Sequence, residues 1–242
     1  KNLEFVGGFE HKNHKDINKP LNKVSGIQSS KLVTANSAQL IKEANVIIDF
    51  TTPESTLDNL KIASTNKTAV VIGTTGMTDI QKKKVKSYSK KIPILMSSNM
   101  SLGVNLLFNL VKQTASALKD TDYDIEIAET HHKHKKDAPS GTALLLGNSV
   151  AKAKNFNLKN KSTTKPNKIR KKQKGRINFF CKRQGNIVGD HSVIFSNVDE
   201  EIELKHRGFD RSIYASGALK AAIWVLKKKK GLFKMTDVLG IS

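Results

Sequence analysis

The stretch NVIIDFTTPESTLDNLKIASTNKTAVVIGTTG (residues 45–76) decides the fold. It contains two short aliphatic runs, at 45–50 and 68–75, of the kind that form strands buried on both faces of a sheet. Between them lies a helical segment, 53–66, in which Pro53 suits the first turn and Thr52 can cap it. A strand–helix–strand unit of this kind predicts neighbouring parallel strands.

The same alternation continues on both sides of this stretch. Aliphatic runs at 2–9 and 92–98 predict further strands, and segments 36–44 and 77–91 can form helices. We therefore expect an α/β fold in which residues 1–100 form a Rossmann-type, doubly wound parallel sheet.

The pattern changes near residue 100. Leu102, Leu106, Leu110 and Val111 have helical spacing within 101–120. Later runs alternate apolar and polar residues, which predicts half-exposed strands in a mostly antiparallel sheet. These runs are 122–130, 176–184, 187–197 and 201–208. We expect a second, α+β domain over 101–211 with a mobile basic loop at 160–174. A helix that begins at Ser212 and has Gly231 after it should return residues 212–242 to the first domain.

Composition narrows the possible functions. The formal net charge is +21, but arginine supplies only five of the 42 basic side chains and the lysines are spread along the chain. Nucleic-acid binding usually favours arginine, so we expect no nucleic-acid partner. A basic surface still attracts anionic small molecules.

Cys181 is the single cysteine, so an internal disulfide is excluded, and no apolar run is long enough for a membrane helix. The cytoplasm is the expected compartment.

The stretch HHKHKKDAPSGTA (131–143) gathers titratable groups beside a helix start. Ser140 or Thr142 can cap the helix that follows, and the free N–H groups at such an end bind anions. Imidazoles and a lysine beside that end could transfer protons to a bound anion. A solvated basic loop is the simpler alternative. A zinc site from His131, His132 and His134 fits no common spacing, and we expect no metal.

Three predicted strands end in similar polar turns. These are DFTTPES (49–55), VIGTTG (71–76) and MSSNMSLG (96–103). In a parallel sheet such ends meet at one crevice, where ligands bind. Glu10 follows the first aliphatic run, where an acid can bond an adenosine ribose. Each could equally be an ordinary turn or an exposed acid.

At this point the residues resemble a known family. ETHHKHKKDAPSGTA (129–143) is similar to the E-x-HH-x-x-K-x-DAPSGTA signature of the 4-hydroxy-tetrahydrodipicolinate reductase (dihydrodipicolinate reductase) family. The segments DFTTPEST, VIGTTG, SSNMSLGVN, RQGNIVGDH and SGALKAAIW also occur in the order that the family shows. The resemblance runs through nearly the whole chain.

The resemblance implies NADH- or NADPH-dependent reduction of a small cyclic dicarboxylate in lysine (diaminopimelate) biosynthesis, by a homotetramer built through the second domain. It implies that His131 is the catalytic acid–base residue and Lys135 the catalytic lysine. The substrate carboxylates would be held by His132, Ser140, Gly141 and Thr142. The cofactor would be bound by Glu10, His11, Gly73, Thr74, Thr75, Ser97, Ser98, Asn99 and Met100.

The chain departs from the family pattern at three places. The N-terminal strand and its G-x-x-G-R-M-G-type turn are not in the sequence, so we expect a chain lacking about 30 residues, one strand–turn–helix unit, and a sheet left open beside residues 3–9. His11 stands where many members have arginine, and Thr52 stands where arginine is common, so cofactor preference is open. A related reductase of another acid and a non-enzymatic basic binding protein are the alternative functions.

Overall fold

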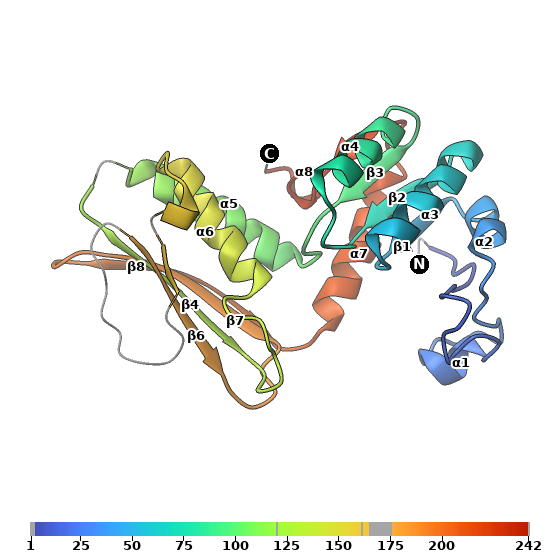
Figure 1. The fold of residues 1–242 in the computed structure, drawn as a ribbon, viewed down its shortest axis with the longest axis horizontal. Helices are drawn as coiled ribbons and strands as arrows, with labels where there is room; N and C mark the ends of the chain where they lie inside the picture. Colours follow the sequence, from blue (N-terminus) through green and yellow to red (C-terminus); the bar gives the residue numbers. More distant parts are fainter. Residues whose placement is uncertain (1–2, 120, 161, 165–175, 242) are drawn as a thin grey trace. The chain divides into compact units, whose positions relative to one another are not determined.

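The computed structural model describes residues 3–119, 121–160, 162–164 and 176–241. The chain divides into two compact units (Figure 1). The first unit comprises Lys1–Ser98 and Gly217–Val238, and the second comprises Asn99–Ser216 and Leu239–Ser242.

A parallel sheet forms the centre of the first unit. Its strands have the order β1-β2-β3-β9, and each neighbouring pair is parallel. Their bounds are Val46–Asp49 (β1), Ala69–Ile72 (β2), Pro93–Met96 (β3) and Gly231–Phe233 (β9). The helices of this unit are α1 (Leu21–Val24), α2 (Ser37–Glu43), α3 (Pro53–Asn66), α4 (Asp79–Tyr88) and α8 (Met235–Leu239), whose last residue belongs to the second unit. The predicted parallel α/β sheet is confirmed.

Local sequence explains the boundaries of α3. Pro53 is the first helical residue, and the Thr52 hydroxyl accepts a hydrogen bond from the Ser55 N–H at 3.4 Å. The helix ends at Asn66, and Lys67 follows in a left-handed conformation that commonly terminates helices.

The strand predicted at 2–9 is wrong. Residues 3–9 contain only an isolated bridge between Phe9 and Thr34. Thr34 donates its N–H to the Gly8 carbonyl at 3.1 Å and accepts from the Glu10 N–H at 3.0 Å. The segment therefore makes these backbone hydrogen bonds with its own neighbouring loop, whereas the described partner of β1 is β2.

The second unit contains a five-stranded sheet in the order β5-β6-β4-β7-β8. Its strands are β4 (Asp124–His131), β5 (Ser162–Thr164), β6 (Ile177–Arg183), β7 (Gly189–Ser196) and β8 (Glu201–Gly208). The pairs β4–β7 and β7–β8 are antiparallel, whereas β4–β6 and β5–β6 are parallel. The α+β class is confirmed, but the sheet is mixed rather than mostly antiparallel, because the helix after β4 returns the chain to pair in parallel.

Two long helices cover one face of this sheet. Helices α5 (Leu102–Ala117) and α6 (Gly141–Ala153) lie side by side there (Figure 1). The core beneath them contains alternate residues of the central strands with the inner faces of both helices. It includes Ile125, Ile127, Ile177, Phe179, Val193 and Phe195 from the sheet and Leu107, Val111, Leu146 and Val150 from the helices.

Two expectations about connecting segments need correction. Residues 162–164 of the loop expected at 160–174 form β5, which hydrogen-bonds to the edge of β6, while 161 and 165–174 lie outside the described residues. The last long helix, α7, ends at Val225, before the lysine run, and Gly231 begins β9. Helix α7 (Ser212–Val225) begins in the second unit and continues in the first. Among the described residues, no helix has the length and apolar character needed to cross a membrane.

Candidate active site

A polar cluster continues the apolar face of the second sheet at one end of its central strands. Successive strand residues point to opposite faces, so residues two apart share a face. On β4, Glu129 and His131 therefore follow the core residue Ile127, and on β7 His191 precedes the core residue Val193. The register pairs Glu129 with His191. The sheet thus gathers these polar side chains beside the start of α6.

Glu129 lies at the centre of this cluster, and its side chain is fully buried. Its Oε1 accepts hydrogen bonds from the Ser140 N–H and from Arg183 Nη2, both at 3.0 Å. Its Oε2 lies 3.3 Å from His131 Nδ1 and 3.7 Å from His191 Nε2. Burial raises the pKa of the carboxyl group, but hydrogen bonds from His131, Ser140 and Arg183 outweigh burial and hold this pKa far below its ordinary value. Glu129 is therefore an anion at every physiological pH.

The two histidines of the cluster are both buried. Their rings meet edge to face, with centroids 5.0 Å apart. Burial, followed by the charge of His131, lowers the pKa of His191 to about 4, so His191 is neutral near pH 7. The Ser140 hydroxyl lies 3.3 Å from His191 Nε2. His131 keeps a small exposed fraction of 10%.

Lys135 lies in the loop that joins β4 to α6. Its ammonium group forms a 2.7 Å ion pair with Asp137 Oδ1, which is the main reason that the Asp137 pKa is low. Arg183 also donates to the Asp137 carbonyl at 2.5 Å, so the loop and Glu129 share one guanidinium. His132 is half-buried, and burial lowers its pKa. Lys135 and His132 thus flank the buried cluster.

The start of α6 has the features of an anion site. Ser140 caps the helix, and its hydroxyl accepts from the Ala143 N–H at 3.2 Å. The first N–H groups of a helix lack partners within it, and the helix dipole favours negative charge there. Space near Gly141 is open, since a β-carbon added there would meet nothing within 4 Å. Gly141 and Thr142 can therefore present N–H donors to a carboxylate.

In the part of the chain that the structure describes, His131, His132 and His134 do not together form a group of potential metal ligands. His132 and His134 have ring centroids 6.4 Å apart. Within the described residues, Glu129, His131 and His191 bring one potential ligand atom each within 4.8 Å of one another. However, the Arg183 guanidinium already neutralises this carboxylate at 3.0 Å. Glu129 Oε2, His131 Nδ1 and His191 Nδ1 have no hydrogen-bond partner among the residues described, so hydrogen bonding satisfies only part of the cluster.

In the first unit, the polar ends of β1 and β2 are joined through Asp49. This buried carboxylate accepts hydrogen bonds from the hydroxyls of Thr51, Thr56 and Thr74 at 2.6, 3.2 and 3.3 Å, and from the Asn59 amide at 3.0 Å. The Thr56 and Thr74 hydroxyls lie 2.9 Å apart. Asp49 therefore fixes the loop after β2 to the start of α3.

That loop contains three expected cofactor residues. Gly73 allows close approach, because a β-carbon there would collide with the Phe50 ring. Thr74 is buried in the Asp49 network and Thr75 is exposed. Gly76 has φ +81°, which glycine adopts readily, and the space beside it is open. The Gly73 N–H donates to the Asp49 carbonyl at 2.8 Å, so the open backbone of this loop lies at Gly76.

The remaining expected cofactor residues fall in both units. Glu10 and His11 are exposed in the first unit, where the Glu10 carboxylate accepts from the His11 N–H at 3.1 Å. Ser97 and Ser98 follow β3. Asn99 and Met100 belong to the second unit, and the Asn99 amide lies 3.4 Å from the Thr142 hydroxyl. The structure thus connects one expected cofactor residue with one expected substrate residue.

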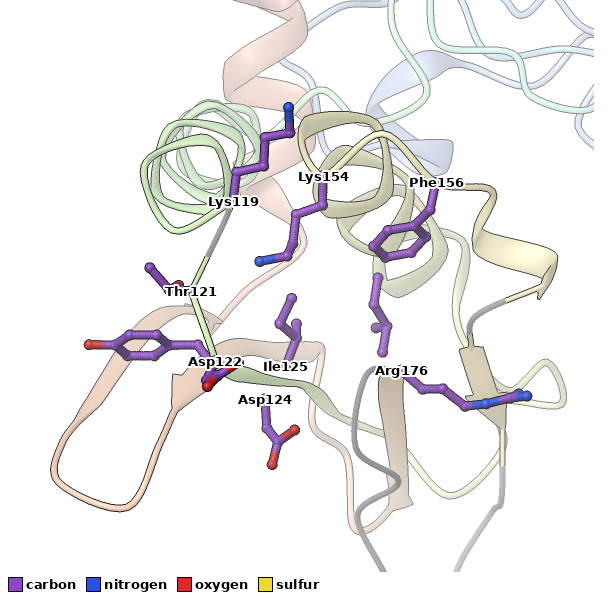
Figure 2. A pocket seen from close by; sticks show the side chains of 10 residues that line it. Lys119, Thr121, Asp122, Asp124, Ile125, Lys154, Phe156 and Arg176 are labelled. Atoms are coloured by element: carbon purple, nitrogen blue, oxygen red, sulfur yellow. The ribbon is translucent and has the colours of Figure 1, made fainter.

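A hollow of about 540 Å³ lies elsewhere in the second unit. Its lining residues come from the ends of α5 and α6 and from the start of β4 (Figure 2). They include Lys119, Lys154 and Asp124. His131 ends β4 and Asp124 begins it, so this hollow is not part of the histidine cluster.

Sequence reasoning assigned no role to Glu129, Arg183, His191 or Asp49. The spacing of Glu129 and His131 was a usable signal, since residues two apart on a strand share a face. Arg183 and His191 enter through pairing, because β6 places Arg183 opposite His131 and β7 places His191 opposite Glu129. Only the register of the sheet reveals those two residues.

The low pKa of His191 predicts a pH-dependent stability. As the pH falls below 6.5 the unfolded chain protonates this imidazole, whereas the folded chain does so only near pH 4. Stability is therefore lost as the pH falls through this window, by up to about 3 kcal/mol. Urea unfolding at pH values between 7 and 4 measures the slope. The variant His191→Gln should lose most of that slope and His134→Gln should keep it; equal slopes in all three proteins would contradict the assignment.

The architecture of the two units is typical of one class of protein. A parallel dinucleotide-type sheet joined to an α+β unit with a buried acid–base cluster is the arrangement of two-domain dehydrogenases and reductases. The fold resembles dihydrodipicolinate reductase from Paenisporosarcina sp. TG-14, whose structure was solved with dipicolinate bound. The TM-score is 0.77 at 24% identity, with 98% of this chain and 89% of that chain covered. An amine dehydrogenase from Mycobacterium smegmatis has a TM-score of 0.62 at 7% identity, covering 96% and 87%.

Sequence comparison then identifies the family. Residues 1–100 match the family described as dihydrodipicolinate reductase, N-terminus, and residues 103–239 match dihydrodipicolinate reductase, C-terminus. The 4-hydroxy-tetrahydrodipicolinate reductase of Pelagibacter ubique (strain HTCC1062) is 49% identical over 90% of this chain and 83% of its own length. That of Parvibaculum lavamentivorans is 44% identical over 99% and 89%. The chain belongs to the dihydrodipicolinate reductase family and is an oxidoreductase.

Proposed function

We propose that this enzyme reduces 4-hydroxy-tetrahydrodipicolinate to tetrahydrodipicolinate with a nicotinamide cofactor, in lysine biosynthesis. The observation that carries the proposal is the buried Glu129–His131 pair beside the open, capped start of α6. It combines a proton-transfer group with an anion site, and both belong to the segment that carries the family signature. A dicarboxylate that gains a proton as it is reduced needs both features.

The second unit supplies the substrate roles in this proposal. The N–H groups of Gly141 and Thr142 and the Ser140–Thr142 turn bind one carboxylate, and His132 with Lys135 attracts the other. The net reaction adds a hydride and one proton and releases the 4-hydroxyl group as water. His131 is the acid–base residue that exchanges a proton with the ring, and Lys135 is the other proton donor, which must exchange its ion pair with Asp137 for one with the ligand. No metal takes part in these roles.

The first unit fits a nicotinamide cofactor. The space beside Gly76 is open at the carboxyl ends of the strands, and the Thr74 hydroxyl donates to the Asp49 carboxylate, which fixes this loop. We assign cofactor contacts to this loop, to Ser97, Ser98, Asn99 and Met100, and to Glu10 with His11 for the ribose. The bound cofactor would supply the hydride.

A spectrophotometric assay tests the function. The purified chain with 4-hydroxy-tetrahydrodipicolinate should oxidise NADH or NADPH, and dipicolinate, a planar dicarboxylate of similar shape, should inhibit in competition with the substrate. Oxidation only with a different small acid would show a related reductase instead. Salt-sensitive DNA binding without any reductase activity would show a basic binding protein.

Cofactor choice gives a separate prediction. The Glu10 carboxylate can accept hydrogen bonds from a ribose hydroxyl but repels a 2′-phosphate. His11, which stands next to it, lacks the planar fork of donors that arginine offers and is a weaker phosphate partner. We expect NADH to be used at least as well as NADPH. A kcat/KM ratio that favours NADPH by more than about tenfold, or roughly 1.4 kcal/mol, would contradict this.

We propose a homotetramer built through the second unit, whose sheet has a shallow hollow on the face formed by Thr130, Ser192 and Lys205. Light scattering of the purified chain should give four times the 26.7 kDa chain mass. We propose the cytoplasm as the compartment, in keeping with the single, buried Cys181.

A further inference from the structure

Glu129 makes more contacts than the one that joins it to the acid–base residue His131. One carboxylate contacts the catalytic strand end, the loop after it and the helix that follows. Its side chain is fully buried, so these contacts are made without competition from water. In the proposed function Glu129 is only the partner of His131 and has no separate role.

We infer that Glu129 is the positioning residue of the active site: it fixes which ring nitrogen of His131 carries the proton and holds the start of α6 in register with that ring. This inference rests on the proposed function for its kinetic consequences. Its structural content, the tautomer of His131, does not depend on any activity.

The contact between Glu129 and His131 favours one tautomer of the neutral ring. Glu129 Oε2 and His131 Nδ1 lie 3.3 Å apart, and neither atom has a hydrogen-bond partner within the described residues, so the contact is an ion pair at hydrogen-bonding distance rather than a formed hydrogen bond. A carboxylate can only accept a hydrogen bond, so a hydrogen on Nδ1 would satisfy both atoms and leave Nε2 as the nitrogen that gains or loses a proton. A β-carbon added to Gly189 would lie 3.0 Å from His131 Nε2, so this glycine keeps the space beside Nε2 free of a side chain.

Glu129 also couples the His131 ring to the anion site at the start of α6. Glu129 Oε1 accepts from the Ser140 N–H, and Ser140 is the residue that caps α6. The same oxygen accepts from Arg183, which also donates to the Asp137 carbonyl. The two carboxylate oxygens thus connect the His131 ring to both ends of the 137–140 segment.

Other charged and titratable groups also face the Glu129–His131 pair. Arg183 balances the buried carboxylate, and His191 is neutral near pH 7 because burial lowers its pKa. Glu129 stabilises the protonated ring electrostatically at 3.3 Å.

The substitution Glu129→Gln tests the inference. The amide oxygen keeps the acceptor position facing Ser140 and Arg183, so the amide NH₂ replaces Oε2 and donates toward His131 Nδ1. We expect the hydrogen of the neutral ring to move to Nε2, which imidazole ¹⁵N NMR of the free protein measures directly. We also expect kcat to fall by about 10²–10⁴-fold with a smaller change in KM, and the pH profile of kcat to move to lower pH, because the variant lacks the charge that stabilises the protonated ring.

A matched control lies on the same strand. Glu126 is also a buried glutamate of β4. It lies three positions before Glu129, so its side chain points to the opposite face of the sheet. Glu126→Gln should leave the His131 tautomer and the pH profile as in the wild type. Equal effects of the two variants, or an unchanged tautomer and kcat in Glu129→Gln, would overturn the inference.

Two further measurements separate the possible failures. If Glu129→Gln does not fold, Glu129→Asp takes its place, because it keeps the charge but withdraws the carboxylate from His131. The same tautomer and pH measurements on that variant then test whether Glu129 positions the ring. If the wild-type chain lacks the reductase activity, the proposed function fails, whereas the ¹⁵N spectrum still tests the positioning of His131. A wild-type ring with its hydrogen on Nε2 would overturn the inference whatever the activity.

Discussion

Replacing His131 by glutamine should lower kcat by about 10²–10⁴-fold, the contribution that general acid–base groups typically make. Glutamine fills much of the same space and can still hydrogen-bond, but it cannot take up a proton near neutral pH. The buried position beside Glu129 means that bulk water cannot easily replace the lost group. Steady-state kinetics with saturating cofactor measure the effect, and KM for the substrate should change little.

Lys135→Ala should lower kcat by a similar factor and should raise KM more, because the ammonium group also attracts a substrate carboxylate. Near-wild-type kcat in both variants would contradict the proposed mechanism. His134 offers a control in the same loop, since it is exposed and lies outside the family signature. His134→Gln should change kcat by less than a factor of about two, as expected for a surface change away from the site.

The sequence predicted the regular elements of the first unit well where local signals agree. Pro53 and Thr52 mark the start of α3, and the runs on either side of it become β1 and β2. The segment 2–9 has the same aliphatic character, yet it forms only the bridge at Phe9. Both segments are largely apolar, but 2–9 contains two glycines, which weaken a strand, and it lacks the non-local pairing partner that β1 has in β2. The three-residue strand β9 was missed for the same reason, because its only signal is pairing with β3.

The site was predictable as far as it is contiguous in the chain. His131, Lys135 and Ser140 stand within ten residues, so a motif reveals them. Arg183 and His191 lie on other strands and reach Glu129 through the register of β6 and β7. A single sequence does not specify that register. The mixed order of the sheet, with β6 parallel to β4, is what places a guanidinium rather than another residue beside the carboxylate.

The role of Asp49 was likewise not evident from the sequence, because Thr74 reaches it only through the pairing of β1 with β2. Asp49→Ala should lower the free energy of unfolding by about 3–5 kcal/mol. The carboxylate accepts from Thr56, Thr74 and Asn59, all buried, and each donor left without an acceptor costs roughly 1–3 kcal/mol. The Thr56–Thr74 contact recovers part of this cost, because those two hydroxyls can still bond each other at 2.9 Å. Urea unfolding at pH 7 measures the change.

The matched control is Asp58→Ala, which replaces an exposed aspartate on the same helix and should change the free energy of unfolding by no more than about 0.5 kcal/mol. Asp49→Ala should also weaken NADH binding, because Thr74 is held by this carboxylate and the loop 73–75 is proposed to contact the cofactor. Fluorescence titration of the folded variant with NADH separates the two effects. A loss of less than about 1 kcal/mol would mean that other contacts satisfy these donors. In that case the Asp49 network would not be what fixes the loop after β2 to the start of α3.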